Sequence, residues 1–297
     1  MTRRSIAAIA ALAALGAVAA APATAKSRFD VTVKTQKLER LSGARYEVWV
    51  VKGAHKFSGG TFNIRPNGTQ TRTTFASPVA PRTADAIAVT VEPVPDPSPA
   101  PSRAVILVGK PSGKSAALAF PVDLSTVSGS FVLASPTDAV TTNETSGLWF
   151  LNPSAGPGPG LNLPALPKGW TYEGWGVSQG TPLSSGKFTA ATGADRSAVF
   201  SGPNPGPPFP GEDFVAGLPS AIAPPFNLAD GNSKAVVSIE PDLGAGVDPS
   251  GPGPFSIKPL VAMIGAGQAD HASVALMQNL GTVPTGSAAL GTRRHMR

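Results

Sequence analysis

The chain has 297 residues, of which 41% are hydrophobic and 14% charged, and its formal net charge is +6. It contains no cysteine, which excludes disulfides and thiolate metal sites. Its 33 glycines and 32 prolines disfavour long helices, while the hydrophobic content is too high for a disordered chain, so short strands joined by Gly/Pro turns are expected.

The first 25 residues resemble an export signal. Arg3 and Arg4 precede an uncharged, mostly apolar run over residues 6–21, and an A-x-A cleavage sequence ends at Ala25. We predict cleavage between Ala25 and Lys26, which places the mature protein in the periplasm, in the cell envelope or outside the cell. The alternative is a retained anchor helix, since the run is nearly long enough to span a bilayer. We expect no transmembrane segment in the mature chain.

Strands of the first half are predicted from alternation of apolar and polar residues. Phe29, Val31 and Val33 alternate with polar residues, and the same period of two indicates strands over residues 46–51 and 87–91. Shorter apolar runs lie at residues 105–108 and 118–120. The Pro-rich residues 93–101 lack donors for a ladder and are expected to form an extended hairpin connection.

The second half is predicted to follow the same plan. Apolar runs indicate strands at the following places: residues 131–134, 148–151, 172–175, around Phe188, 236–239 and 255–260. The Gly-Pro tract at residues 156–160 is too short for collagen and is expected to be a loop.

Three motifs recur in the same order, which indicates an internal duplication. Tyr-Glu-Val-Trp at residues 46–49 returns as Tyr-Glu-Gly-Trp at 172–175, Phe62 corresponds to Phe188, and the segment 88–93 corresponds to 236–241. Residues that both copies share are expected to maintain the fold. The equivalent Trp49 and Trp175 are therefore expected in the core.

The predicted fold class is all-β, with two tandem antiparallel β-sandwich (Ig-like) domains after an N-terminal signal helix. The expected boundaries are a signal peptide over 1–25, a first domain over 26–125, a second domain over 126–285 with an insertion loop at 201–227, and a tail over 286–297.

The insertion loop is the largest departure from the repeat. Residues 62–92 span 30 positions, whereas the equivalent residues 188–240 span 52. Long loops of this kind often carry binding, so the candidate interaction residues are Phe209, Glu212, Asp213 and Phe214. The alternative is that the loop packs on its own domain, because two phenylalanines are costly to leave in water.

The motifs at residues 46–49, 60–62, 88–93 and 105–109 resemble the extracytoplasmic C-terminal domain of anti-sigma-K factors. That domain shows a YELW strand, a small-G-x-F strand, an AVTLEP strand, and a Pro/Ser linker before an apolar strand that ends in Gly. The resemblance covers most of residues 40–110 and parts of 160–260. It implies a β-sandwich. The sigma-binding domain and membrane helix of that family have no counterpart in the sequence, so sigma-factor sequestration is not expected.

Charge is unevenly distributed along the chain. Residues 26–135 hold 14 Lys/Arg and 7 Asp/Glu, whereas residues 136–292 hold 5 and 11. The basic half could contact an anionic envelope polymer or lipid, or the two halves could be ordinary solvated surfaces that attract each other weakly. A nucleic-acid partner is not expected, because no basic-aromatic motif is present.

Enzyme motifs are incomplete. The near P-loop at residues 109–115 is one residue short and has no helix pattern after it, and the S-x-x-K at Ser184 coincides with a non-catalytic stretch in the first copy. The three histidines are not at ligand spacing. Glu92 and Glu240 recur before a proline and are expected to accept backbone N–H groups. No catalytic residue, cofactor or metal is expected.

Two weaker possibilities remain open. Asp138, Asn143 and Glu144 in one loop, and Glu212 with Asp213 in another, could hold Ca²⁺ or be solvated loop acids. Trp149 and Trp170 have no counterpart in the first copy and could stack on a sugar or be buried.

The expected function is that of a non-enzymatic exported binding or structural protein whose partner is an envelope protein or polymer. The alternatives are an extracytoplasmic regulatory or sensor component of an anti-sigma-type signalling system, and a secreted enzyme with an unrecognised site.

Overall fold

The computed structural model describes residues 29–222, 226–244 and 246–293, and the chain is all-β with antiparallel sheets, as predicted. The helical residues described are three short 3-10 turns: η1 (Pro81–Thr83), η2 (Glu144–Ser146) and η3 (Leu280–Thr282). The predicted signal segment, with its cleavage site at Ala25 and Lys26, lies outside the described residues.

An eight-stranded antiparallel sheet, here called the first sheet, has the order β3-β2-β5-β6-β7-β19-β1-β4. Its strands are β1 (Phe29–Gln36), β2 (Ala44–Lys52), β3 (His55–Phe62), β4 (Thr74–Ser77), β5 (Ala86–Pro93), β6 (Val105–Gly109), β7 (Ser115–Ala119) and β19 (Thr285–Arg293). The edge strands β3 and β4 contact each other, so the sheet curls back on itself. The alternation expected for β1 is present, since Val31 and Val33 are fully buried.

A seven-stranded antiparallel sheet, here called the second sheet, has the order β12-β8-β18-β17-β16-β13-β14. Its strands are β8 (Ser128–Phe131), β12 (Leu161–Asn162), β13 (Trp170–Ser178), β14 (Thr181–Phe188), β16 (Lys234–Pro241), β17 (Leu260–Met263) and β18 (Val274–Gln278). Two separate two-stranded sheets are also present: β9 (Leu148–Trp149) pairs with β15 (Gly211–Glu212), and β10 (Leu151–Asn152) pairs with β11 (Gly158–Pro159).

The duplication read from the sequence is present in the strand register. Tyr46 lies opposite Phe62 and Tyr172 lies opposite Phe188, and the two ring pairs stack at 5.2 and 5.7 Å between centroids. Each strand has a register shift immediately before its tryptophan, at Trp49 in β2 and at Trp175 in β13. Trp49 and Trp175 are both buried, as expected. The shared motifs therefore specify one local architecture built twice.

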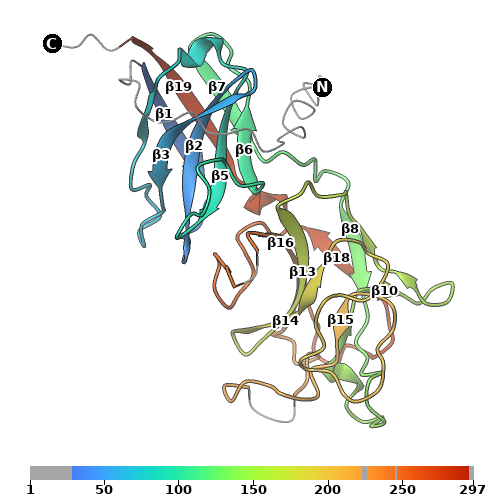
Figure 1. Cartoon of the computed structure of the whole chain (residues 1–297). Coiled ribbons are helices and arrows are strands. Elements are labelled where there is room, and N and C mark those ends of the chain that lie inside the picture. The colour runs from blue at the N-terminus through green and yellow to red at the C-terminus, as the bar shows by residue number, and fades with distance from the viewer. Residues whose placement is uncertain (1–28, 223–225, 245, 294–297) are drawn as a thin grey trace.

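The last strand of each repeat lies in the sheet of the other repeat. By chain order, β8 follows β7 and ends the first repeat, and β19 follows β18 and ends the second repeat. However, β8 pairs with β18 and β12 of the second sheet. In the same way, β19 pairs with β7 and β1 of the first sheet. Figure 1 shows β19 between β1 and β7, far in sequence from both. We call this arrangement the strand exchange.

Matching registers show that β8 and β19 are equivalent strands. Gly129 of β8 lies opposite Leu161, and Gly286 of β19 lies opposite Thr35, which is the residue 126 positions before Leu161. Each of these glycines makes a close approach, since an added Cβ would meet the Leu161 side chain at 2.7 Å or the Lys34 carbonyl oxygen at 2.9 Å. Both exchanged strands thus have a glycine at the same place, where a neighbouring strand comes close.

The expected tail over 286–297 is wrong for residues 286–293, because they form β19 at the interior of the first sheet. Ala288 and Leu290 of this strand are almost fully buried. One continuous hydrophobic cluster includes side chains of both sheets, from Val31 to Leu290. The exchange therefore joins the two repeats by strand pairing and by a shared core.

Candidate binding cleft

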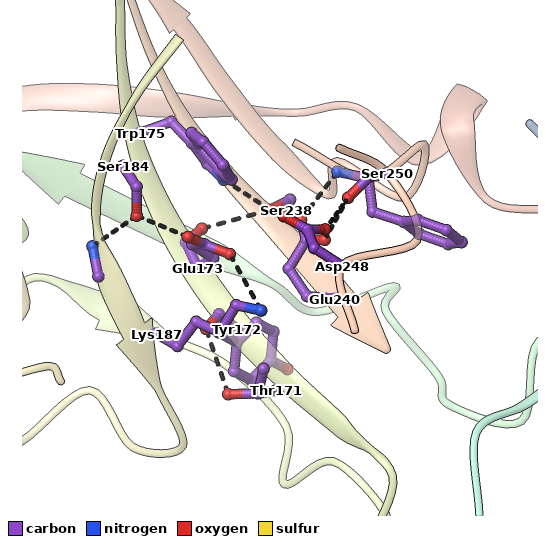
Figure 2. A network of polar contacts seen from close by, with 12 residues as sticks. Thr171, Tyr172, Glu173, Trp175, Ser184, Lys187, Ser238, Glu240, Asp248 and Ser250 are labelled. Atoms are coloured by element: carbon purple, nitrogen blue, oxygen red, sulfur yellow. Dashed lines mark hydrogen bonds and ion pairs between the residues drawn. The ribbon is translucent and has the colours of Figure 1, made fainter. Parts of the chain in front are cut away.

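Two equivalent hydrogen-bond networks surround the repeated glutamates. In the second repeat, the indole of Trp175 donates to Ser238 at 2.8 Å, and Ser238 donates to Glu240 at 2.5 Å (Figure 2). The backbone N–H of Phe255 also donates to Glu240, at 2.8 Å. The prediction that Glu240 accepts a backbone N–H group is therefore confirmed.

The first repeat contains the same network with other residues. Trp49 donates to Thr90 at 2.8 Å, Thr90 donates to Glu92, and the backbone N–H of Ser102 donates to Glu92 at 2.9 Å. A second carboxyl beside each network accepts a serine hydroxyl: Glu47 from Ser58, and Glu173 from Ser184 at 2.5 Å. Ser184, the first residue of the S-x-x-K match, thus has the same structural role as Ser58, because each hydroxyl donates to the equivalent glutamate.

Burial raises the pKa values of these carboxyl groups. The pKa of Glu92 and that of Glu240 each rise to about 7, first because burial penalises the charged form. The pKa values of Glu47 and Glu173 are raised for the same reason. Because the networks occur in both repeats and their glutamates hold connecting loops to strands, they maintain the fold.

The junction of the two repeats contains a cleft of about 620 Å³. One wall is the Pro-rich connection between β5 and β6, and the other is formed by the segment before β13 and the residues after β14 and β16. Its lining includes Glu92, Asp96, Arg103, Lys168, Trp170, Thr189 and Asp242. At the back of the junction, the backbone at Gly169 lies very close to the backbone at Arg103. A Cβ added to Gly169 (φ +94°) would lie 2.3 Å from the carbonyl carbon of Arg103.

At the equivalent junction on the other side, two hydrogen bonds join the loop of the first repeat to the turn of the second. The backbone N–H of Ser42 donates to the carbonyl of Pro249 at 2.9 Å, and the N–H of Ser256 donates to the Glu39 carboxylate at 3.1 Å. Lys168 occupies the position of Ser42, since the two are 126 positions apart. The duplication therefore repeats the contact between loop and turn, and the side with Lys168 opens into the cleft described above.

Polar groups in the cleft are available for a ligand. Within the described part of the chain, the side chains of Arg103, Lys168 and Asp242 form no ion pair or hydrogen bond, and all three are exposed. The indole N–H of Trp170 is buried and has no hydrogen-bond partner. Trp170 itself is 4% exposed and packs edge-on against Phe120 at 5.3 Å. Neither its ring face nor its N–H group is therefore free for a ligand.

The expected contact residues of the insertion loop need correction. Phe209 is 8% exposed, and Glu212, Asp213 and Phe214 are fully buried. Phe214 packs against Phe200 and Phe226, and Glu212 accepts the hydroxyl of Ser201. Of the two alternatives for these side chains, packing on their own domain is the one the structure shows, because both phenylalanines are buried.

Asp213 is a structural carboxylate of this loop, and we predict a large effect of its removal. It accepts the indole N–H of Trp149 at 2.7 Å, and the N–H and hydroxyl of Thr137. Asp213→Ala leaves these buried donors unsatisfied and should lower the free energy of unfolding by about 3 kcal/mol in urea denaturation. The exposed Asp270→Ala serves as control and should change it by less than about 0.5 kcal/mol. Equal stability of the two variants would refute this assignment.

The remaining candidates have ordinary surroundings. Trp149 is 4% exposed and, like Trp170, presents no sugar-stacking face. In the described residues no group of three or more His, Asp or Glu side chains is arranged to hold a metal ion, and Glu144 instead accepts the N–H of Ser135. The loop at residues 109–115 connects β6 to β7 as a hairpin and leads into a strand.

Comparison of the chain with family models, with curated proteins and with solved structures yields no match. In the part of the chain that the structure covers, no helix has the length and apolar character needed to cross a membrane.

Proposed function

We propose that this is an exported, non-enzymatic binding protein of the cell envelope, built from two Ig-like sandwich repeats, and that its ligand occupies the cleft at their junction. The observation that carries the proposal is the break in the duplication at that place. Features common to both repeats serve the fold, whereas Lys168 and Trp170 of the cleft lining stand where the first repeat has Ser42 and Ala44.

The lining of the cleft supports binding rather than catalysis. The three exposed charged groups Arg103, Lys168 and Asp242 can hydrogen-bond to a polar ligand. Glu92 is held by Thr90 and by the backbone of Ser102, so it is fixed in a structural network. The partner proposed from the sequence is an envelope protein or polymer.

A regulatory role is the second candidate. The motifs shared with the extracytoplasmic domain of anti-sigma-K factors favour a sensor component of an anti-sigma-type system, and a ligand in the cleft would then be the signal. A sigma or anti-sigma gene beside the gene for this chain would favour this candidate over a purely structural one.

The proposal is tested by charge reversal in the cleft. Binding of the mature protein to purified cell-wall polymer and to envelope extract is measured by cosedimentation and affinity capture. We expect the double variant Arg103→Glu/Lys168→Glu to lose at least about tenfold in retained protein, because two exposed cations of the cleft become anions.

The matched control is Lys110→Glu/Lys114→Glu. It makes the same change in charge on the exposed hairpin between β6 and β7, away from the cleft lining. It should retain binding at the level of the unmodified protein. Equal loss in both variants would indicate a net-charge effect, and no loss in either would contradict the cleft as the binding site.

A further inference from the structure

Arg103, in the cleft lining, is the equivalent of Ser256 at the other junction. The residue before each of them donates its backbone N–H to the repeated glutamate of its own network. The residue after each of them accepts, through its carbonyl oxygen, the N–H of the residue that precedes that glutamate. These two hydrogen bonds establish the equivalence, which constant spacing in the sequence does not show because the connecting loops differ in length.

The cleft has a cation at both places where the other junction has a serine. Arg103 takes the place of Ser256, and Lys168 takes the place of Ser42. The two basic residues belong to segments that touch, since a Cβ added to Gly169 would lie 2.3 Å from the carbonyl carbon of Arg103. In the described part of the chain, neither cation forms an ion pair. Two cations on adjoining segments without a counter-ion favour a bound anion.

A carboxylate of the other junction has no counterpart on the cleft side. At the other junction, the Glu39 carboxylate accepts the backbone N–H of Ser256 at 3.1 Å. The position equivalent to Glu39 is Ala165, which is 126 residues later, and residues 161–167 include no acidic residue. Within the described residues, the backbone N–H of Arg103 donates no hydrogen bond. The cleft side thus keeps the donor of this contact and adds two cations, but it lacks the acceptor.

Two acidic side chains of the cleft oppose an anion but do not neutralise the cations. Asp96 accepts the N–H of Ser98 at 2.9 Å on the Pro-rich connection. Asp242 is exposed and comes close to the segment of Lys168, since its own backbone N–H donates to the Gly169 carbonyl at 2.8 Å. Among the described residues, neither carboxylate forms an ion pair with a cation of the cleft. Asp242 should therefore weaken the binding of an anion without preventing it.

We propose that the cleft binds a glutamate-like carboxylate of a partner polypeptide, beside Arg103 and Lys168, and that this group accepts the backbone N–H of Arg103. The ligand carboxylate takes the place that the Glu39 carboxylate has at the other junction. A carboxylate accepts charge-assisted hydrogen bonds from all three donors, from the guanidinium, the ammonium and the backbone N–H. This inference rests on the proposed function and names the chemical class of its ligand.

The test uses Nα-acetyl-glutamate N-methylamide as probe and the corresponding glutamine compound as its uncharged counterpart. Binding to the full chain is measured by calorimetry, and the backbone amide of Arg103 is followed by nuclear magnetic resonance. We expect the charged probe to bind at least about tenfold more tightly than its counterpart and to shift the Arg103 amide resonance. Equal affinity, or no binding of either probe, would overturn the inference. Tighter binding of glucuronate than of the glutamate probe would contradict a polypeptide as the source of the carboxylate.

The substitution Ala165→Glu gives the sharpest test, because it copies the carboxylate of the other junction to the equivalent position beside the cleft. The tethered carboxylate should compete with the probe and reduce its affinity about tenfold, while Ala165→Gln, of the same length but uncharged, should leave the affinity unchanged. Ala165 is exposed, so both variants should fold. Unchanged affinity in Ala165→Glu, or equal loss in Ala165→Gln, would contradict the assignment.

Lys168→Ser removes one cation by restoring the residue of the other junction. It should weaken probe binding about tenfold, whereas Lys110→Ser, the same change on the exposed hairpin between β6 and β7, should have no effect. Asp242→Asn should strengthen probe binding several-fold, because it removes a like charge near the ligand. Equal affinity of Lys168→Ser and Lys110→Ser would refute the role of Lys168, and weaker binding by Asp242→Asn would show that the site does not select an anion.

Failure of this inference can be told apart from failure of the proposed function. If Arg103→Glu/Lys168→Glu abolishes envelope binding but the carboxylate probe does not bind, the cleft remains the site and the ligand class is wrong. If the probe binds as expected and envelope binding is insensitive to the cleft, the ligand class holds and the envelope role is wrong instead.

Discussion

A chain that ends after Val283 should fail to form a stable first sheet. The deletion removes β19, which pairs with seven residues of β1 and five of β7 and buries Ala288 and Leu290. Loss of ladders on both sides, together with these buried side chains, should cost more than about 5 kcal/mol, comparable with the whole stability of a typical domain. Because one hydrophobic cluster extends through both sheets, the second sheet should lose stability too.

The control for this deletion is a chain that ends after Arg293, which keeps β19 intact. Urea denaturation followed by tryptophan fluorescence and far-ultraviolet circular dichroism should give this control the stability of the full chain. If residues 286–297 were a tail outside the fold, both truncations would be harmless. Native-like stability of the chain that ends at Val283 would therefore contradict the position of β19.

The second large effect concerns the dependence of stability on pH. Burial raises the folded-state pKa of Glu240 from 4.5 to about 7. A group whose pKa is raised on folding contributes stability below its unfolded pKa, and that contribution is lost as pH rises through its folded pKa. The free energy of unfolding should therefore fall between pH 5 and pH 8, by about 2 kcal/mol for Glu240 alone.

Replacement of the titrating group isolates this contribution. Glu240→Gln keeps an acceptor for the Phe255 N–H group but cannot ionise, so its stability should change less between pH 5 and pH 8. The equivalent Glu92→Gln should act in the same direction, since burial raises the pKa of Glu92 to about 7 as well. Urea denaturation at both pH values measures the difference. Stability that rises with pH in the unmodified protein would refute the inferred direction.

Local patterns in the sequence were sufficient for most strands and for the duplication. The alternation of Val31 and Val33 indicates burial on one face, and the recurrence of Tyr46 as Tyr172 fixes the register of β2 and β13. The repeated Glu92 and Glu240 were identified as structural because a residue shared by two separate repeats must serve what those repeats share. These inferences need only neighbouring residues and the repeat itself.

The strand exchange could not be predicted in the same way, because β19 pairs with strands more than 160 residues earlier. A signal for it is nonetheless present. Leu124, Gly129 and Ser130 recur as Leu280, Gly286 and Ser287, and this recurrence marks β8 and β19 as equivalent. The cleft was missed since it combines loops of both repeats, and only Trp170, which lacks a counterpart, pointed toward it.

The most direct test of the strand exchange uses four pairs of engineered cysteines in a chain that has none of its own. In the exchanged arrangement, Ala117 lies opposite Ser287 and Ala275 lies opposite Ser130. If each repeat kept its last strand, the equivalent pairs would be Ala117 with Ser130 and Ala275 with Ser287. All four pairs join an alanine to a serine, so the substitutions are matched.

Oxidised monomers of the four double-cysteine variants are analysed by mass spectrometry, since only residues with close Cα atoms can form a disulfide. The exchange predicts intramolecular disulfides in Ala117→Cys/Ser287→Cys and Ala275→Cys/Ser130→Cys, and free thiols in the other two variants. Disulfides in Ala117→Cys/Ser130→Cys and Ala275→Cys/Ser287→Cys, with free thiols in the first two variants, would contradict it.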